Sequence, residues 1–308
     1  MAASAAAKGC IEVPLDKCGT TYLNYCLECG TSGGYDCEKC CPGCTQVVKD
    51  DDKYCNCKPG PSPGPPPGND TWANYQAGGM DVISVTGGDH QPYEKVVIML
   101  HGGGGQGSDW EYQYDQGWLG NLTGLKYVFP TSALQSHVWF NTFKNGCGED
   151  DDCAYDIPSI GAAADRVAEL IEHEKALVGG DSSKVYLAGF SEGAQLTGYM
   201  QLCKLEYALG GTIVMDGFPL PPLFDMPGHS TAEARRNATY YGQDMRWMIW
   251  WGQADPIFPY PFSTDYWQSI LSVLGANSTL EILQTTPRMG HTLIKEEFDT
   301  MVAFIRGS

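Results

Sequence analysis

The stretch Gly189-Phe190-Ser191-Glu192-Gly193 decides the fold, because it joins the apolar run at 185–188 to a helix-like stretch at 194–205. A sharp strand-to-helix turn holds a serine hydroxyl in the open, where a histidine can take its proton and make it nucleophilic. Gly189 and Gly193 suit so tight a turn, because a Cβ there would clash with the neighbouring strand and helix. A G-x-S-x-G pattern alone occurs by chance, but this context predicts a nucleophile elbow centred on Ser191.

A second glycine-rich stretch lies upstream, where the strand-like run 96–100 leads directly into His101-Gly102-Gly103-Gly104-Gly105. Such a loop lets a backbone N–H face a substrate carbonyl, where it stabilises the negative charge of a tetrahedral intermediate. A flexible glycine turn is the alternative interpretation, which the position after a central-looking strand disfavours. The stretch is therefore a candidate oxyanion loop.

Six histidines are candidates for the base that takes the serine proton. With a nucleophile elbow, the acid and then the histidine follow the serine along the chain. Five histidines are set aside because they precede the serine, lie in a charged helical stretch, or would reverse that order: His90, His101, His137, His173 and His229. His291 remains, after the strand-like run 280–284 and before the last helix.

Two aspartates satisfy the order for the acid. Asp255 follows the strand-like run 247–251, and Asp216 ends the run 212–215. A carboxylate in either place would hold the imidazole tautomer and offset the imidazolium charge. Asp255 is favoured, because Pro256 stiffens its turn and a helix-like segment then leads toward the histidine.

These segments together resemble the phospholipase/carboxylesterase family of α/β-hydrolases, which includes acyl-protein thioesterases, lysophospholipases and small bacterial carboxylesterases. The resemblance covers nearly all of residues 93–308 and rests on five segments: Leu100-His101-Gly102-Gly103-Gly104, Val138-Trp139-Phe140, the elbow at 189–193, Gly252-Gln253-Ala254-Asp255-Pro256, and Gly290-His291. It implies an α/β-hydrolase fold, a mostly parallel sheet with helices on both faces. It also implies Ser191 as nucleophile, Asp255 as acid and His291 as base, with the backbone N–H groups of Gly103 and Glu192 as oxyanion donors. This chemistry needs no cofactor or metal.

Three features depart from the family. Glu192 stands where the family usually has glutamine, which predicts retained activity with an altered pH dependence. Gly103 replaces a larger apolar residue common in the thioesterases, which predicts a changed floor of the acyl site. Cys147 and Cys153 are not expected in cytosolic members, and they weaken transfer of a protein-depalmitoylating role.

The rest of the chain alternates between strand and helix patterns, as an α/β domain does. The predicted strands lie near 82–86, 96–100, 126–129, 185–188, 212–216, 246–251 and 280–284. The clearest predicted helix covers 159–178 and presents one apolar face. We expect a catalytic domain over residues 70–308.

The front of the chain is a different kind of sequence. Ten of the 13 cysteines fall in the first 57 residues, a stretch with few large aliphatic side chains, so it needs covalent or metal staples. We predict a cysteine-rich module over 1–58 and a semi-rigid Pro/Gly-rich linker over 59–69. Several C-x-x-C spacings are compatible with zinc, but disulfides are the favoured interpretation. Cys147 with Cys153 is a further predicted disulfide, and Cys203 is left as a buried thiol.

Disulfides are favoured because the chain carries four N-glycosylation sequons, at Asn69, Asn121, Asn237 and Asn277. These predict secretion into an oxidising compartment. The net charge of −18 argues against nucleic acid or anionic membranes as partners. No hydrophobic run reaches the length of a membrane span.

These observations predict a secreted serine esterase acting on a small-molecule or polymer-borne ester, with lipid, acylated polysaccharide and polyester all open. Aromatic residues, Trp139 and Phe258 among them, are candidates to line an acyl or aryl pocket, with core packing equally good. The tethered module suggests a cell-wall or polymer surface as its partner. The alternative is an extracellular structural or adhesion protein that retains the hydrolase domain as a scaffold.

Overall fold

The computed structural model describes residues 44–49, 52–57, 70–87, 93–142, 155–220, 245–260, 262–273 and 280–307. The chain divides into two compact units, Met1–Gly64 and Pro65–Ser308. In the first unit, strand β1 (Cys44–Lys49) pairs antiparallel with strand β2 (Asp52–Cys57). The remainder of the predicted cysteine-rich module, and the linker at 59–69, lie outside the described residues.

The second unit is built on one sheet of eight strands in the described chain, in the order β10-β9-β8-β7-β5-β6-β4-β3. The strands are β3 (Thr71–Ala77), β4 (Met80–Thr86), β5 (Lys95–Leu100), β6 (Leu125–Thr131), β7 (Val185–Phe190), β8 (Gly211–Met215), β9 (Trp247–Gly252) and β10 (Leu280–Thr286). Neighbours from β10 to β6 are parallel, whereas β6, β4 and β3 pair antiparallel. This is the mostly parallel sheet that the sequence predicts, and all seven predicted strands are present.

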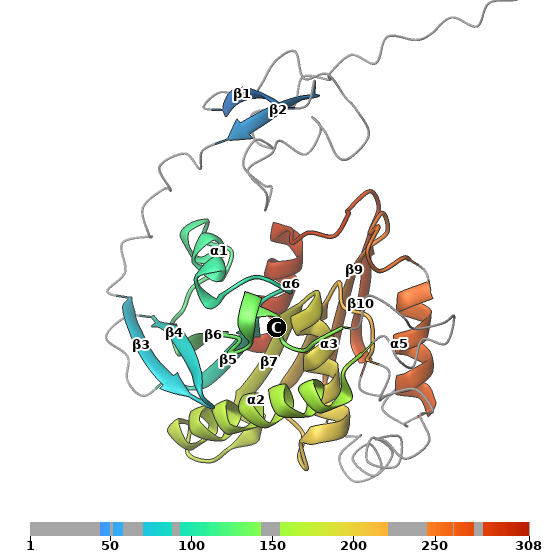
Figure 1. Cartoon of the computed structure of the whole chain (residues 1–308). Coiled ribbons are helices and arrows are strands. Elements are labelled where there is room, and N and C mark those ends of the chain that lie inside the picture. The colour runs from blue at the N-terminus through green and yellow to red at the C-terminus, as the bar shows by residue number, and fades with distance from the viewer. Residues whose placement is uncertain are drawn as a thin grey trace, which may run out of the picture. The chain divides into compact units, whose positions relative to one another are not determined.

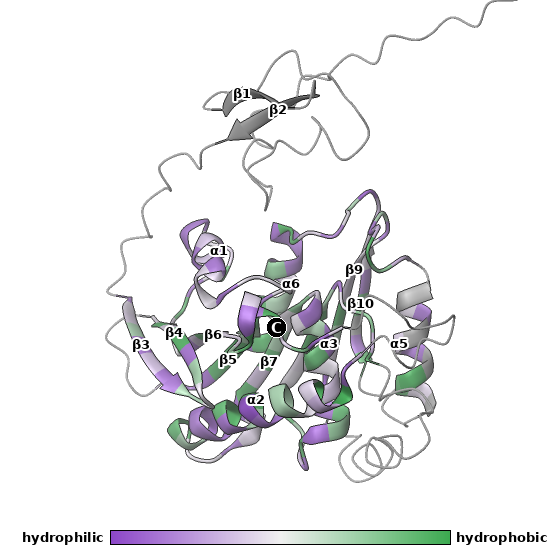
Figure 2. Ribbon diagram, in the orientation of Figure 1, coloured by the Kyte–Doolittle hydropathy of each residue, from purple (hydrophilic) through white to green (hydrophobic). Residues whose placement is uncertain are grey.

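Helices cover both faces of this sheet (Figure 1). They are α1 (Glu111–Asp115), α2 (Ile157–Leu177), α3 (Glu192–Tyr199), α5 (Phe262–Val273) and α6 (Lys295–Arg306). The 107–122 segment, which contains α1, packs with α6 in one core layer; α2, α3 and α5 pack on the opposite face. Because both faces are covered, β7, β8 and β9 are buried at every position, and the central strands are mainly hydrophobic (Figure 2).

Strand β9 and helix α5 contribute four buried tryptophans to the core. Trp247, Trp250 and Trp251 of β9 are all buried, as is Trp267 of α5. The indole Nε1 of Trp251 donates to the carbonyl of Phe258 at 2.9 Å, and that of Trp267 donates to Gly217 at 2.7 Å. These bonds connect the core to two loops at the carboxyl ends of the strands.

The edge strand β3 was not predicted from the sequence, although a signal for it exists. β3 and β4 form a hairpin whose two-residue turn is Gly78-Gly79, with φ of +58° and +67°. A turn with positive φ at both central positions favours glycine and matches the twist of the strands. A Cβ on Gly78 would also clash with the carbonyl of Arg166 on α2. The diglycine therefore sets both the hairpin and its contact with the helix.

The helix predicted over 159–178 is confirmed as α2, with Ile160, Ala164 and Val167 fully buried. The stretch predicted as helical over 194–205 forms α3 and then a wider turn at Met200–Lys204. Within the described residues, no helix is both long and apolar enough to span a membrane.

Candidate active site

Ser191 lies at the sharp turn between β7 and α3. Its backbone φ is +56° with ψ of −121°, a conformation that L-residues rarely adopt and that marks a locally strained position. A Cβ on Gly193 would lie 2.5 Å from the carbonyl oxygens of Leu100 and His101, and one on Gly189 would clash with Gly193. Glycine at both flanks is therefore required by close packing, as the sequence indicates.

Three side chains from distant parts of the chain meet at this turn. The Oγ of Ser191 lies 2.7 Å from Nε2 of His291, and Nδ1 of His291 lies 2.8 Å from Oδ2 of Asp255. Because the carboxylate accepts from Nδ1–H, Nε2 is free to accept the serine proton. The structure thus brings Ser191, His291 and Asp255 into one hydrogen-bonded chain.

The Asp255 carboxylate is held on its other side by its own turn. Its side chain is fully buried, and Oδ1 accepts from the backbone N–H groups of Ile257 and Phe258, at 2.7 and 2.9 Å. These bonds leave Oδ2 directed at His291. Asp255, and not its rival Asp216, is hydrogen-bonded to the histidine.

Aromatic rings flank the imidazole of His291. The ring centroid of Phe190 lies 4.9 Å away, and that of Phe258 lies 5.5 Å away at 61° to the imidazole plane. Phe258 is half-buried and lies parallel to Phe218, with ring centroids 6.5 Å apart. Of the two residues predicted to bind substrate, Phe258 is the one that lies beside His291.

The predicted oxyanion loop lies against the elbow. A Cβ on Gly102 would lie 3.4 Å from the Cβ of Ser191. His101 is buried: its Nε2 accepts from the backbone N–H of Ser132 at 3.1 Å, and Nδ1 lies 2.7 Å from the carbonyl of Gly102. Burial lowers the pKa of His101 to about 4, so the ring is neutral at ordinary pH and fixes the loop.

Glu192 contacts this loop through its side chain, which the sequence did not reveal. Oε2 accepts from the backbone N–H of Trp139 at 3.1 Å, and Oε1 from that of Phe140 at 3.4 Å. A Cβ on Gly103 would lie 2.8 Å from Oε2 of Glu192. The two departures from the family pattern, Gly103 and Glu192, are therefore in contact. The Glu192 carboxylate occupies the position that the Cβ of a larger residue at 103 would need. Burial raises the pKa of Glu192 to about 7.

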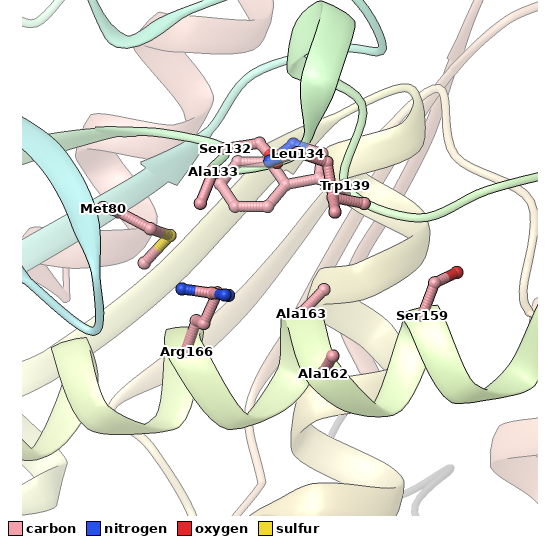
Figure 3. Close-up of a pocket in the computed structure, with 9 residues that line it drawn as sticks. All are labelled: Met80, Ser132, Ala133, Leu134, Trp139, Ser159, Ala162, Ala163 and Arg166. Atoms are coloured by element: carbon pink, nitrogen blue, oxygen red, sulfur yellow. The ribbon is translucent and has the colours of Figure 1, made fainter.

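Trp139 is 1% exposed, and its indole Nε1 donates to the carbonyl of His101 at 2.7 Å. The ring borders a small pocket between the 132–134 loop and α2 (Figure 3). The residues around this pocket are Met80, Ser132, Ala133, Leu134, Trp139, Ser159, Ala162, Ala163 and Arg166. Ser191 and His291 are not among them. Trp139 is thus placed as a support of the oxyanion loop, where it does not face the nucleophile.

The remaining predicted sites are largely beyond the described residues. Cys147, Cys153, Asn69, Asn237 and Asn277 lie outside them. Asn121 is exposed, and its Oδ1 accepts from the N–H and hydroxyl of Thr123, the other polar residue of its sequon.

Residues 82–308 match the phospholipase/carboxylesterase family. The chain belongs to this family. Acyl-protein thioesterase 1 of Debaryomyces hansenii is 22% identical over 228 residues, which cover 70% of this chain and 91% of that protein. Feruloyl esterase B of Talaromyces stipitatus is 23% identical over 222 residues, covering 64% and 58% of the two chains.

Solved structures of the phospholipase/carboxylesterase family share the fold. The phospholipase/carboxylesterase of Dyadobacter fermentans superposes with a TM-score of 0.54 at 21% identity, covering 73% of this chain and 95% of that one. Family membership makes this chain an ester hydrolase of the esterase/thioesterase type. The predicted α/β-hydrolase fold is thereby confirmed for the second unit.

Proposed function

We propose that the chain is a serine hydrolase that cleaves carboxylic esters through an acyl-enzyme, with Ser191, His291 and Asp255 as its triad. The observation that carries the proposal is the hydrogen-bonded chain from Ser191 Oγ through His291 to Asp255 Oδ2, with distances of 2.7 and 2.8 Å. The first distance is short enough for proton transfer from serine to histidine, and the second is a hydrogen bond that orients the imidazole.

In the first half-reaction, Ser191 Oγ attacks the ester carbonyl carbon while its proton passes to Nε2 of His291. The carbonyl oxygen becomes an oxyanion, which the backbone N–H groups of Gly103 and Glu192 stabilise. The intermediate collapses, the C–O bond to the alcohol breaks, and the alcohol takes the proton from His291. In the second half-reaction, His291 takes a proton from water, which attacks the acyl-serine; the acid is released and Ser191 regains its proton.

The surface beside the base supports an ester with an apolar or aromatic acyl group. Phe190 and Phe258 contact the imidazole of His291, and Ile257 and Tyr260 of the same turn are 59% and 38% exposed. Exposed apolar side chains beside a reactive centre favour apolar substrates. The names of the relatives, an acyl-protein thioesterase and a feruloyl esterase, agree with this class. Lipid, acylated polysaccharide and polyester all present such groups.

We further propose that the protein is secreted, disulfide-bonded and glycosylated, and that its first unit holds the enzyme at a cell-wall or polymer surface. The four sequons and the ten clustered cysteines support this proposal. Intact mass before and after reduction and deglycosylation tests it. A protein with 12 oxidised cysteines and attached glycans is expected, and bound zinc would contradict it.

A fluorophosphonate probe tests the hydrolase proposal. We expect one probe per chain, attached to Ser191, and loss of p-nitrophenyl butyrate hydrolysis by several orders of magnitude in Ser191→Ala. Ser183→Ala, at a surface turn before β7, is the matched control and is expected to label fully. Undiminished hydrolysis in Ser191→Ala would end the assignment.

A further inference from the structure

We propose that Asp216 is a positioning residue of this site: it joins the turn that carries Asp255 to the loop that carries His291, and it shares a buried proton with Glu297. The inference rests on the proposed function, because it concerns the same histidine. Asp216 would act through His291 and Asp255 and would not touch substrate.

The position of Asp216 between two loops supports its role as a positioning residue. It follows β8 directly, is fully buried, and has a φ of +49°. Its backbone N–H donates to the carbonyl of Trp250 at 3.0 Å. Its Oδ1 accepts from the backbone N–H of Gly252 at 2.7 Å, and one of its carboxyl oxygens lies within 4.8 Å of a ring nitrogen of His291. Gly252 leads into the turn that carries Asp255, so this carboxyl lies between that turn and the loop that carries His291.

Buried oxygen atoms without hydrogen-bond partners support the shared proton. In the described part of the chain, four buried oxygen atoms close to this point have no hydrogen-bond partner: Oδ2 of Asp216, Oγ1 of Thr292, and both carboxyl oxygens of Glu297. Glu297 lies in the first turn of α6 and is fully buried. An unpaired carboxylate in such a place is costly, whereas a protonated carboxyl can donate to a neighbouring oxygen. A proton held between Asp216 and Glu297 would satisfy both.

The charges around Asp216 also favour its protonated form. The titratable groups facing it in the described residues are Asp255 after β9, His291 before α6 and Glu297 on α6. One ligand atom from each of Asp216, Asp255 and His291 lies within 4.8 Å of the others. Burial, with the nearby Asp255 charge adding to it, raises the pKa of Asp216 to about 8. Burial and then Asp216 raise the pKa of Glu297 well above its usual range, against a smaller opposing effect of the backbone N–H of Ile294.

Asp216 is therefore neutral at pH 7 and becomes a carboxylate above about pH 8. A second negative charge so close to His291 would stabilise the imidazolium that forms as the serine proton is transferred. An opposite charge at this distance shifts an imidazole equilibrium by about tenfold. The rate should thus gain an additional rise in the alkaline range that depends on Asp216.

The test compares kcat/KM of the wild type and Asp216→Asn from pH 6 to 10. The amide keeps an acceptor for Gly252 N–H but cannot ionise. We expect the ratio of wild-type to variant rates to grow by about tenfold from pH 7 to 9.5. Glu297→Gln should move this growth to lower pH, because its amide can donate to an ionised Asp216. The control, Glu296→Gln on the exposed side of the same turn, should leave the profile unchanged. A ratio that stays constant with pH would overturn the proposal, as would an unmoved midpoint in Glu297→Gln.

A readout independent of catalysis separates this inference from the proposed function. Because the pKa of Asp216 is higher in the folded than in the unfolded chain, the folded state holds more protons between about pH 4 and 8. The stability of the wild type should therefore fall across this window, whereas that of Asp216→Asn should not fall for this reason. The Tm of the variant minus the Tm of the wild type should increase from pH 5 to pH 8. A constant difference would refute the buried proton even if esterase activity is present. Activity retained in Ser191→Ala would refute the proposed function, but the pH dependence of the Tm difference would still test the buried proton.

Discussion

Replacing Glu192 by glutamine tests whether the residue after the nucleophile is a buried, titrating acid. The glutamine amide oxygen can still accept from a backbone N–H of the 139–140 segment, so the fold is preserved. What changes is charge, because glutamine does not ionise. We expect a more stable protein at neutral and alkaline pH.

The magnitude follows from the pKa of Glu192, about 7 in the folded protein against an ordinary value of 4.5. The unfolded chain loses this proton near pH 4.5, whereas the folded chain keeps it until about pH 7. Since the folded state binds more protons between these values, its stability falls as pH rises through the window and levels off above it. The difference between the two pKa values corresponds to at most about 3 kcal/mol of unfolding free energy.

Urea unfolding at pH 4.5, 6, 7 and 8 measures this effect. The free energies of unfolding of Glu192→Gln and wild type should nearly coincide at the lowest pH, and the variant should lead by up to about 3 kcal/mol at pH 8. Glu169→Gln, an exposed position on α2, is the control and should show no such trend. A difference that does not vary with pH, or a variant that is less stable at pH 8, would refute the reasoning.

The same substitution has a kinetic consequence. The Glu192 carboxylate lies against Gly103, one of the proposed oxyanion donors. A negative charge there opposes the charge that develops on the substrate oxygen. The ratio of variant to wild-type kcat/KM should therefore rise as pH passes 7.

Three further outcomes are expected. Asp255→Asn should lower kcat by about 10³ to 10⁴, because the amide no longer fixes the tautomer of His291, and steady-state kinetics at pH 8 will measure it. Lys126→Met should destabilise the second unit by about 3–5 kcal/mol in urea unfolding. The fully buried Glu174 carboxylate lies 2.7 Å from the Lys126 ammonium, and the variant leaves it with the Tyr75 hydroxyl but without this lysine. Deleting residues 1–64 should leave kcat/KM on a soluble ester within about twofold but reduce binding to an insoluble polymer, because tethering acts only at a surface; equal binding by both forms would contradict a targeting role.

The hydrogen-bonded arrangement of Ser191, His291 and Asp255 could be predicted because each residue lies in a local pattern that the sequence records. Ser191, Asp255 and His291 each follow an apolar strand, and the carboxyl ends of parallel strands meet at one edge of a sheet. The order of the residues along the chain leaves both Asp255 and Asp216 as candidate acids, and Pro256 with the helix-like segment after it favours Asp255. Local pattern and chain order were together sufficient.

Other features depend on contacts between distant segments, which a single sequence does not record. Trp139 is buried, and its indole donates to the carbonyl of His101, which is distant in the sequence. The role of the Glu192 side chain requires knowing that Gly103 lies beside it. The local sequence indicates Asp216 only as an alternative acid, because nothing local reveals that Glu297 lies near it. Only the β3–β4 hairpin had a local signal, its diglycine turn, that could have been used.

The buried tryptophans of β9 and α5 make intrinsic fluorescence a reporter of this site. Four of the chain's eight tryptophans are Trp247, Trp250, Trp251 and Trp267. Two of their indole N–H groups bond to the carbonyls of Phe258, in the acid turn, and Gly217, the residue after Asp216. Indole emission responds to the polarity and hydrogen bonding of its surroundings, so ultraviolet fluorescence will report strain or ionisation at the acid side of the site without dye, label or substrate.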